Sequence, residues 1–242
     1  MAKSAADMEA AADDQVLASR LGYWTALSTT VVGVATLAVA ITTPARSGPY
    51  CRSACISYPY TDVAAFVPRD YLWMYPAALL AVLFVTLTAC FHQQASPTST
   101  VAARIALSLA VIAAAAIVID YGVQLTVLQP SLLKGETEGL SPFSQYNPHG
   151  VFIALENVGY LATGVAFLFA SAVFAGGSRL ERGIRWLFLG GGTLTLAAAV
   201  LLSVRYGADL DSRFEVASLS IDWVVLLVGG ILLSIFFRRS HP

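Results

Sequence analysis

Six long apolar runs constrain this chain more than any other feature. Each run is about as long as the roughly 20-residue helix that crosses a bilayer core of about 30 Å. The runs cover residues 21–43, 70–91, 101–128, 150–174, 184–204 and 217–237. One such run could be a buried core helix, but six in succession joined by short polar links predict a membrane protein. The expected fold class is an all-α, polytopic membrane helical bundle with six transmembrane helices.

Composition supports this class and excludes others. Of the 242 residues, 57% are hydrophobic and 12% are charged, whereas about a quarter of the residues in an average soluble domain are charged. The net charge of −1 gives no basic surface for nucleic acid, so the expected partner is the lipid bilayer. The sequence lacks a phosphate-binding loop, a dinucleotide fingerprint and a Gly-x-Ser-x-Gly nucleophile motif. We therefore expect no cofactor.

The basic residues predict which side of the membrane each end occupies. Residues 1–20 are acidic, unlike a secretory signal, so the first run is expected to be a retained helix. An even number of spans puts both termini on one side, and Lys and Arg favour the cytoplasmic side. The sequence predicts cytoplasmic tails at 1–20 and 238–242, a transmembrane domain at 21–237, and location in the inner (plasma) membrane. Eight basic residues then lie inside and six outside: Lys3, Arg20, Arg104, Arg179, Arg182, Arg185, Arg238 and Arg239 against Arg46, Arg52, Arg69, Lys134, Arg205 and Arg213.

The first link is then extracytoplasmic and holds Cys51 and Cys55. In an oxidising compartment two cysteines this close can form a disulfide. They could also remain inert thiols or supply two metal ligands, although a structural zinc site needs four and no second pair lies nearby. We expect no metal.

Two helix starts carry local signals. Tyr71, Trp73 and Tyr75 open the second span and are expected to form an interfacial aromatic belt. At the fourth span, Asn147 is expected to cap the helix, with Pro148 at its first helical position.

Three acids fall within the predicted spans, namely Asp120, Glu156 and Asp222. A charged residue at mid-membrane costs roughly 2.5–3.5 kcal/mol, so such residues face the bundle interior, a partner or water. Asp120 is late in an outward-running helix and the other two are early in inward-running helices. At 1.5 Å per residue all three lie about 8–15 Å from the external interface. With the other polar residues near this level, the candidate ligand-binding set is Asp120, Gln124, Glu156, Asn157, Asp222, Arg205, His149 and Tyr160.

This one-sided position predicts an outward-facing polar pocket for a small ligand or a lipid headgroup. The first alternative is a structural or assembly subunit, in which Arg205 and tyrosine hydroxyls neutralise the acids and hold helices together. A second is proton-coupled transport, and a third is a membrane enzyme with the acids as general acid and base or with His149 and two carboxylates around a divalent metal. No diagnostic spacing favours an enzyme, so no catalytic residue is assigned.

Two stretches carry a resemblance. They are Pro-Arg-Asp-Tyr-Leu-Trp-Met-Tyr-Pro at 68–76, and Asn-Pro-His-Gly at 147–150 followed by Ala-Leu-Glu at 154–156. In these stretches the chain resembles uncharacterised prokaryotic six-span membrane proteins. The resemblance implies an inner-membrane location and no particular activity.

Overall fold

The computed structural model describes residues 5–239, and secondary structure in this range is entirely helical. Six helices are long and apolar enough to cross a membrane, which confirms the predicted all-α class and number of candidate spans. Residues 1–4 and 240–242 lie outside the described range, so Lys3 and the end of the predicted C-terminal tail are not placed. The six candidate spans are Asp14–Ala40, Arg69–Gln93, Thr100–Leu133, Val151–Ala170, Arg179–Asp209 and Arg213–Arg239.

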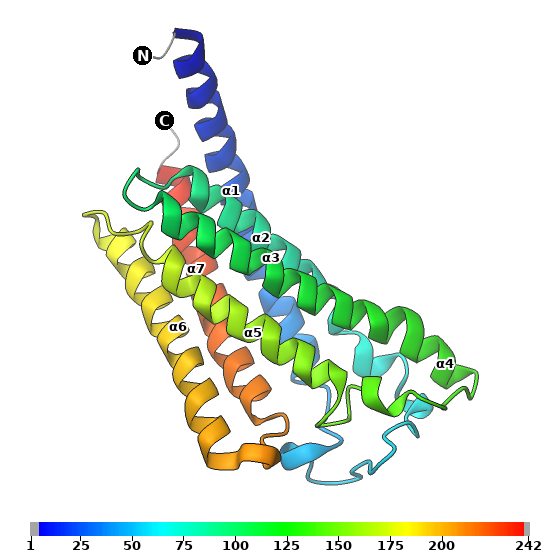
Figure 1. Cartoon of the computed structure of the whole chain (residues 1–242). Helices are drawn as coiled ribbons and strands as arrows, with labels where there is room; N and C mark the ends of the chain where they lie inside the picture. The colour runs from blue at the N-terminus through cyan, green and yellow to red at the C-terminus, as the bar shows by residue number, and fades with distance from the viewer. Residues whose placement is uncertain (1–4, 240–242) are drawn as a thin grey trace.

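The long helices follow one another up and down the molecule (Figure 1). They are α1 (Ala5–Ala40), α2 (Met74–Gln93), α3 (Thr100–Val123), α5 (Val151–Ala170), α6 (Arg179–Tyr206) and α7 (Arg213–Arg239). A π-helical segment, η4 (Gln124–Leu128), joins α3 to the short α4 (Gln129–Leu133). The links contain the 3₁₀ turns η1 (Gly48–Tyr50), η2 (Ala64–Phe66), η3 (Arg69–Tyr71), η5 (Ser141–Phe143) and η6 (Gly207–Asp209).

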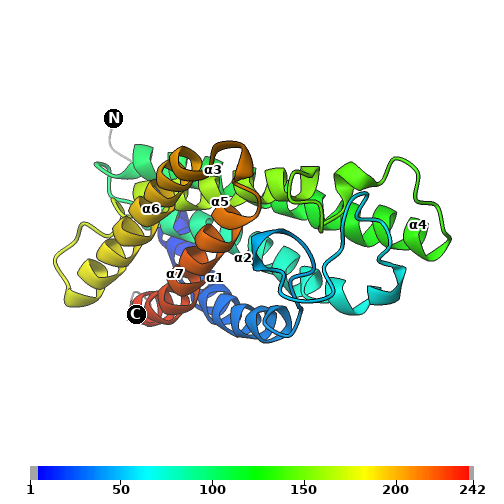
Figure 2. The same cartoon turned by 90° about the horizontal axis from the view of Figure 1, so that it is seen from below.

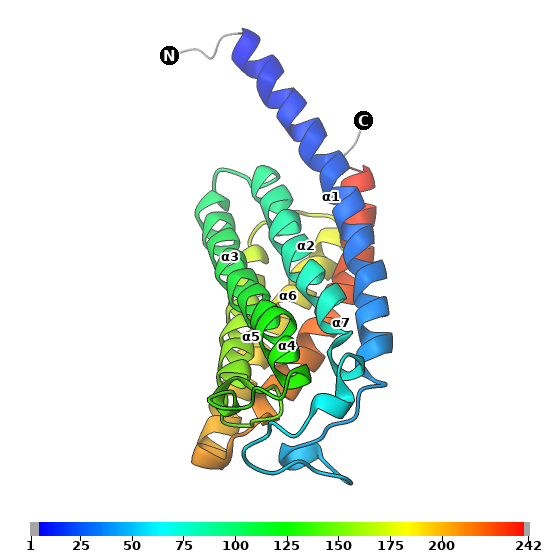
Figure 3. The same ribbon diagram turned by 90° about the vertical axis from the view of Figure 1, so that its right-hand side faces the viewer.

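Helix contacts place α2, α3, α5 and α7 around the centre of the bundle. α1 packs on α2 and α7, α3 packs on α2 and α5, and α7 also contacts α5 and α6. The N-terminal end of α1 and the C-terminal end of α7 lie at the same end of the bundle, which we call the termini end (Figures 1 and 3). The opposite end carries links 41–68 and 134–150, and we call it the link end; Figure 2 shows these links from below.

The two halves of the bundle have different cores. In the termini half, phenylalanines pack on one another, with Phe167 stacked on Phe188 at 5.2 Å between ring centroids and Phe91 edge-on to Phe174 at 5.7 Å. The core of the link half is rich in tyrosine, including the buried Tyr71, Tyr121, Tyr146 and Tyr160. Polar hydroxyls are therefore concentrated toward the link end.

The predicted cap of α5 is wrong, and α1, α6 and α7 begin before the predicted apolar runs. α5 begins at Val151 with Gly150 as its N-cap, because Asn147 is engaged elsewhere: its Oδ1 accepts the backbone N–H of His149 at 3.0 Å and its amide donates to the Ser141 carbonyl at 3.0 Å. A side chain at 150 would collide with the Pro142 carbonyl, 2.8 Å from a Cβ there. α7 begins at Arg213, four residues before the predicted 217.

The predicted aromatic belt at the start of the second span is also wrong for two of its three members. Tyr71 is completely buried, and Trp73 is half-buried with its indole N–H donating to the Asp70 carbonyl at 3.0 Å. Only Tyr75 is exposed. The short η3 turn before α2 rotates the first two rings inward, where the link half of the core buries them.

Three consecutive glycines of α6, at positions 190–192, provide a test of helix packing. A Cβ on Gly192 would meet the Gly164 carbonyl and the Leu168 side chain of α5, whereas a Cβ on Gly190 would meet nothing within 4 Å. We predict that Gly192→Ala destabilises the protein by about 1–3 kcal/mol through overpacking. Gly190→Ala, the matched control, should be neutral or stabilising by up to about 1 kcal/mol. The unfolding midpoint in detergent measures both, and equal effects would contradict the α5–α6 packing.

Candidate functional site

Two adjoining cavities occupy the link half of the bundle. The inner cavity, of about 70 Å³, lies between α2, α3, α5 and α7. The vestibule, of about 270 Å³, lies among link residues at the link end and includes Arg46, Tyr146 and Glu215 in its lining. Trp73, Leu219 and Trp223 line both cavities. The two cavities thus adjoin at these three side chains.

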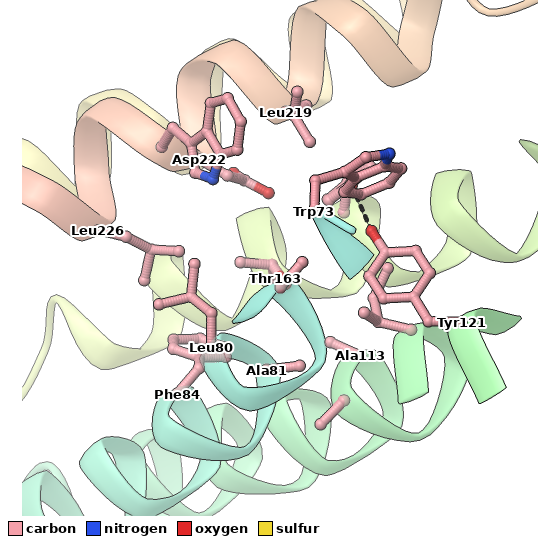
Figure 4. A pocket seen from close by; sticks show the side chains of 15 residues that line it. Trp73, Leu80, Ala81, Phe84, Ala113, Tyr121, Thr163, Leu219, Asp222 and Leu226 are labelled. Carbon is pink, nitrogen blue, oxygen red and sulfur yellow. Dashed lines mark hydrogen bonds between the residues drawn. The ribbon is translucent and has the colours of Figure 1, made fainter. Parts of the chain in front are cut away.

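Asp222 supplies the carboxylate of the inner cavity. Its side chain is 3% exposed, and both carboxylate oxygens are buried without a hydrogen-bond partner. The Thr195 hydroxyl approaches from α6, but it donates to the Gly191 carbonyl at 3.1 Å. The carboxylate points into a space bordered by Trp73 and Thr163, with Leu80 and Phe84 toward the termini end (Figure 4). Asp222 is therefore a buried carboxyl without a hydrogen-bond partner in the wall of a largely apolar cavity.

A second acidic group surrounds Glu156, which is completely buried. Its Oε1 accepts hydrogen bonds from the hydroxyls of Tyr121 at 2.6 Å and Tyr160 at 3.0 Å. The two hydroxyls lie 3.2 Å apart, and both tyrosines also line the inner cavity. The Glu215 carboxyl of α7 faces the carboxyl of Glu156, and Asp120 of α3 lies within electrostatic range of both. One Asp120 oxygen is buried without a partner.

A salt bridge fastens the first link to the start of α2. The guanidinium of Arg46 pairs with the buried carboxylate of Asp70, which also accepts the Tyr146 hydroxyl at 3.1 Å. The Arg46 guanidinium also lies over the Phe66 ring, 3.4 Å from its centroid. Hydrogen bonding to Asp70 raises the pKa of Arg46, and burial raises the pKa of Tyr146. Arg46 thus stays charged and Tyr146 stays a donor, so the connection holds across the neutral pH range.

The structure brings together part of the predicted site. Asp120, Glu156 and Tyr160 form one group, and Asp222 faces the inner cavity that Tyr160 also lines. The other four predicted residues lie elsewhere. Gln124 donates to the Phe143 carbonyl at 2.5 Å, Asn157 is half-buried outside both cavities, exposed His149 pairs with Asp211 at 3.1 Å, and exposed Arg205 lies over the Tyr206 ring.

Arg205 therefore does not neutralise the buried acids as the structural hypothesis supposed. Arg205 is exposed near the link end of α6, and its guanidinium lies over the ring of its neighbour in sequence, Tyr206. The Glu156 carboxyl is stabilised by hydrogen bonds from Tyr121 and Tyr160. It forms no ion pair with the described residues.

Sequence reasoning missed Glu215, Tyr121 and Trp73. Glu215 was assigned to a polar link, but it lies in the first turn of α7, seven residues before Asp222. Residues seven apart lie close to one face of a helix, so this spacing was the available signal. Tyr121 and Trp73 carried no such signal, because an aromatic residue near a span end is equally typical of a lipid-facing belt.

A disulfide between Cys51 and Cys55 closes a small loop within the first link. Arg46, Ser47 and Tyr50, which line the vestibule, lie just before this small loop. Cys90 is buried near the termini end and is free. The two kinds of cysteine thus occupy opposite ends of the bundle.

The site can accept hydrogen bonds and positive charge. Its carboxyls lack basic partners, and the described residues contain no group of three or more His, Cys, Asp or Glu arranged to hold a metal ion. Protons or an organic cation are the species that such carboxyls can take up. No protein-family model, curated protein or solved structure matches the chain. Function is therefore argued from the site alone.

The Arg46–Asp70 pair generates a stability prediction. Arg46→Ala leaves Asp70 buried beside Tyr146 without its cation, and removing one partner of a buried pair typically costs about 3–5 kcal/mol. We expect a markedly lower unfolding midpoint in detergent, with recovery when Asp70→Asn is added. Arg205→Ala, which removes an exposed arginine, should change stability by no more than about 0.5 kcal/mol. Equal effects of the two arginine variants would contradict the assignment.

Proposed function

We propose that this chain is an inner-membrane protein that binds a small ligand or lipid headgroup in a cavity open to the extracytoplasmic side. The observation that carries the proposal is the pair of adjoining cavities with Asp222 at the inner one. Structural acids are expected to have their acceptors satisfied, yet both oxygens of Asp222 have no partner. A carboxylate left free inside an apolar cavity is better explained by something that binds there.

The proposed orientation puts the termini end in the cytoplasm. The described basic residues at helix ends on that side include Arg179, Arg182 and Arg238, as expected for cytoplasmic flanks. Arg20 lies within α1, beside Arg238 of α7. The Cys51–Cys55 disulfide lies at the link end, and disulfides persist in oxidising compartments outside the cytoplasm. Both features support a vestibule that faces outward.

The alternatives receive less support. Proton-coupled transport needs polar groups on both sides of the midplane, but between the arginines at the termini end and the acids of the link half the described helices carry no acidic or basic side chain. Phenylalanines fill that interval instead. A purely structural role suits Asp70, which has Arg46, and Glu156, which has two tyrosines, but leaves Asp222 without a reason.

Accessibility labelling tests the proposal. In a Cys90→Ala background, we predict that Leu219→Cys reacts with a membrane-impermeant maleimide added to right-side-out vesicles, because position 219 lines both cavities. Leu194→Cys should not react, since it lies on the outer face of α6, where lipid keeps the thiol protonated.

Two exposed positions fix the orientation in the same assay. Glu136→Cys at the link end should react from outside, and Thr98→Cys at the termini end should react only after the membrane is opened. Reaction of Thr98→Cys but not Glu136→Cys from outside would invert the topology. A Leu219→Cys thiol that stays unreactive while Glu136→Cys reacts would show that the cavity is closed and would reject the proposed function.

A further inference from the structure

In the link half of the bundle, four buried or half-buried acidic side chains have no basic partner in the described part of the chain. Asp120, Glu156, Glu215 and Asp222 have no basic partner among the described residues, whose ion pairs are Arg46–Asp70, His149–Asp211 and Arg213–Asp211. Arg46 and Arg213 are thus already engaged at the edge of the bundle, and His149 adds a positive charge only when it is protonated. Uncompensated carboxylates in hydrocarbon are costly, so each of these groups must either take up a proton or bind a cation from outside the chain.

Asp222 is the acid best placed to bind a cation. Glu156 already accepts two tyrosine hydroxyls and faces Glu215, which allows that pair to share a proton. Asp222 has no second carboxyl beside it. It lines the inner cavity, its oxygens have no hydrogen-bond partner among the described residues, and the nearby Thr195 hydroxyl donates to the Gly191 carbonyl. Two free acceptor oxygens match the N–H groups of an ammonium ion, which is a donor only.

The remaining lining of the two cavities suits the same kind of ligand. The rings of Trp73 and Trp223 stand at the junction of the cavities, and Tyr121 and Tyr160 line the inner one. Aromatic faces attract cations by about 0.5–2 kcal/mol. Leu80, Ala81 and Phe84 on the opposite wall are apolar, which disfavours a hydrated inorganic ion. An anion is disfavoured by Asp222 itself.

Cavity size limits the group that reaches Asp222. The inner cavity of about 70 Å³ has room for roughly five water-sized spheres, enough for an ammonium group with a short carbon stem. The vestibule of about 270 Å³ can hold the rest of the ligand, against apolar residues such as Phe152 and Ile153. The ligand would pass Trp73, Leu219 and Trp223 on its way from one cavity to the other.

We infer that the inner cavity binds the ammonium group of a primary amine, with its nitrogen at Asp222 and its carbon body extending toward the vestibule. This inference rests on the proposed function and assigns its ligand class. A free alkylamine or arylalkylamine and the ethanolamine headgroup of a phospholipid share this chemistry.

A matched series of probes tests the assignment. Phenethylammonium, phenethyl alcohol and phenylacetate share one carbon body and differ in the charge of the headgroup. Binding to the full chain in phosphatidylcholine nanodiscs, with sodium chloride in excess, is measured by calorimetry. Phenethylammonium should bind at least about tenfold more tightly than the alcohol, and phenylacetate should bind more weakly still, because only the ammonium compensates Asp222.

Variants separate the site from partition into lipid. Asp222→Asn keeps the shape of the side chain and removes its charge, and it should weaken phenethylammonium binding by about 30-fold or more. Its unfolding midpoint without ligand should be equal to or above that of the unaltered chain, which shows that folding is intact. Asp209→Asn, the control at an exposed acid of the link end, should bind like the unaltered chain.

The outcomes are distinct. Weaker apparent amine binding after phosphatidylethanolamine is added to the nanodiscs supports the inference with a lipid source, and unchanged binding supports it with a free amine. Equal binding of amine and alcohol, binding unaffected by Asp222→Asn, or no amine binding overturns the inference. If Leu219→Cys is still labelled from outside in that case, the proposed pocket stands and only its ligand class is wrong.

Discussion

The interaction on which this structure depends is the neutralisation of carboxyl groups inside an apolar bundle. Each acid in such a place needs a cation, a proton or hydrogen-bond donors. Asp70 has the guanidinium of Arg46, and Glu156 has the hydroxyls of Tyr121 and Tyr160. Asp222 has no cation among the described residues, and the nearby Thr195 hydroxyl donates to the Gly191 carbonyl instead. This difference separates Asp70 and Glu156, which help to build the bundle, from Asp222, which we assign to a ligand.

The rest of the bundle maintains that difference. The phenylalanine core of the termini half fills the space between the inner cavity and the termini end, where Phe84 packs edge-on to Phe167 with ring centroids 5.5 Å apart. At the link end the first link is held down at Arg46 and at Tyr60, whose carbonyl accepts the Ser144 hydroxyl at 2.8 Å. The cavities are thus bounded by packed phenylalanine rings toward the termini end and by two links that are hydrogen-bonded to each other at the link end.

The sequence predicted the features that depend on length and helix direction. Six apolar runs gave six candidate spans, and the direction of each run put Asp120, Glu156 and Asp222 in one half of the bundle. The hydrogen bond between Glu156 and Tyr160 also agrees with their four-residue spacing, because such residues share a helix face. These inferences need only the rise and period of a helix.

Features that depend on tertiary contact could not be predicted in this way. Arg46 and Asp70 are separated by 24 positions, on either side of an irregular link, so nothing in their spacing indicates a salt bridge. Asn147 has the composition of a helix cap, but the nearby Ser141 carbonyl and the His149 N–H engage its side chain first. Arg205 was expected to meet the acids because it lies at their depth, whereas the position of α6 outside the central four helices points it away.

The central claim is that Asp222 faces a ligand cavity and is not a helix-pairing residue. A crystal structure with phenethylammonium carrying bromine on its ring tests this most directly, because anomalous scattering locates the bromine independently of the protein density. The account predicts a bromine peak in the vestibule or at the Trp73–Trp223 junction, with the ammonium nitrogen within hydrogen-bonding distance of Asp222, and loss of the peak in Asp222→Asn. Bromine found only on the lipid-facing surface, or a peak unchanged in Asp222→Asn, would contradict it.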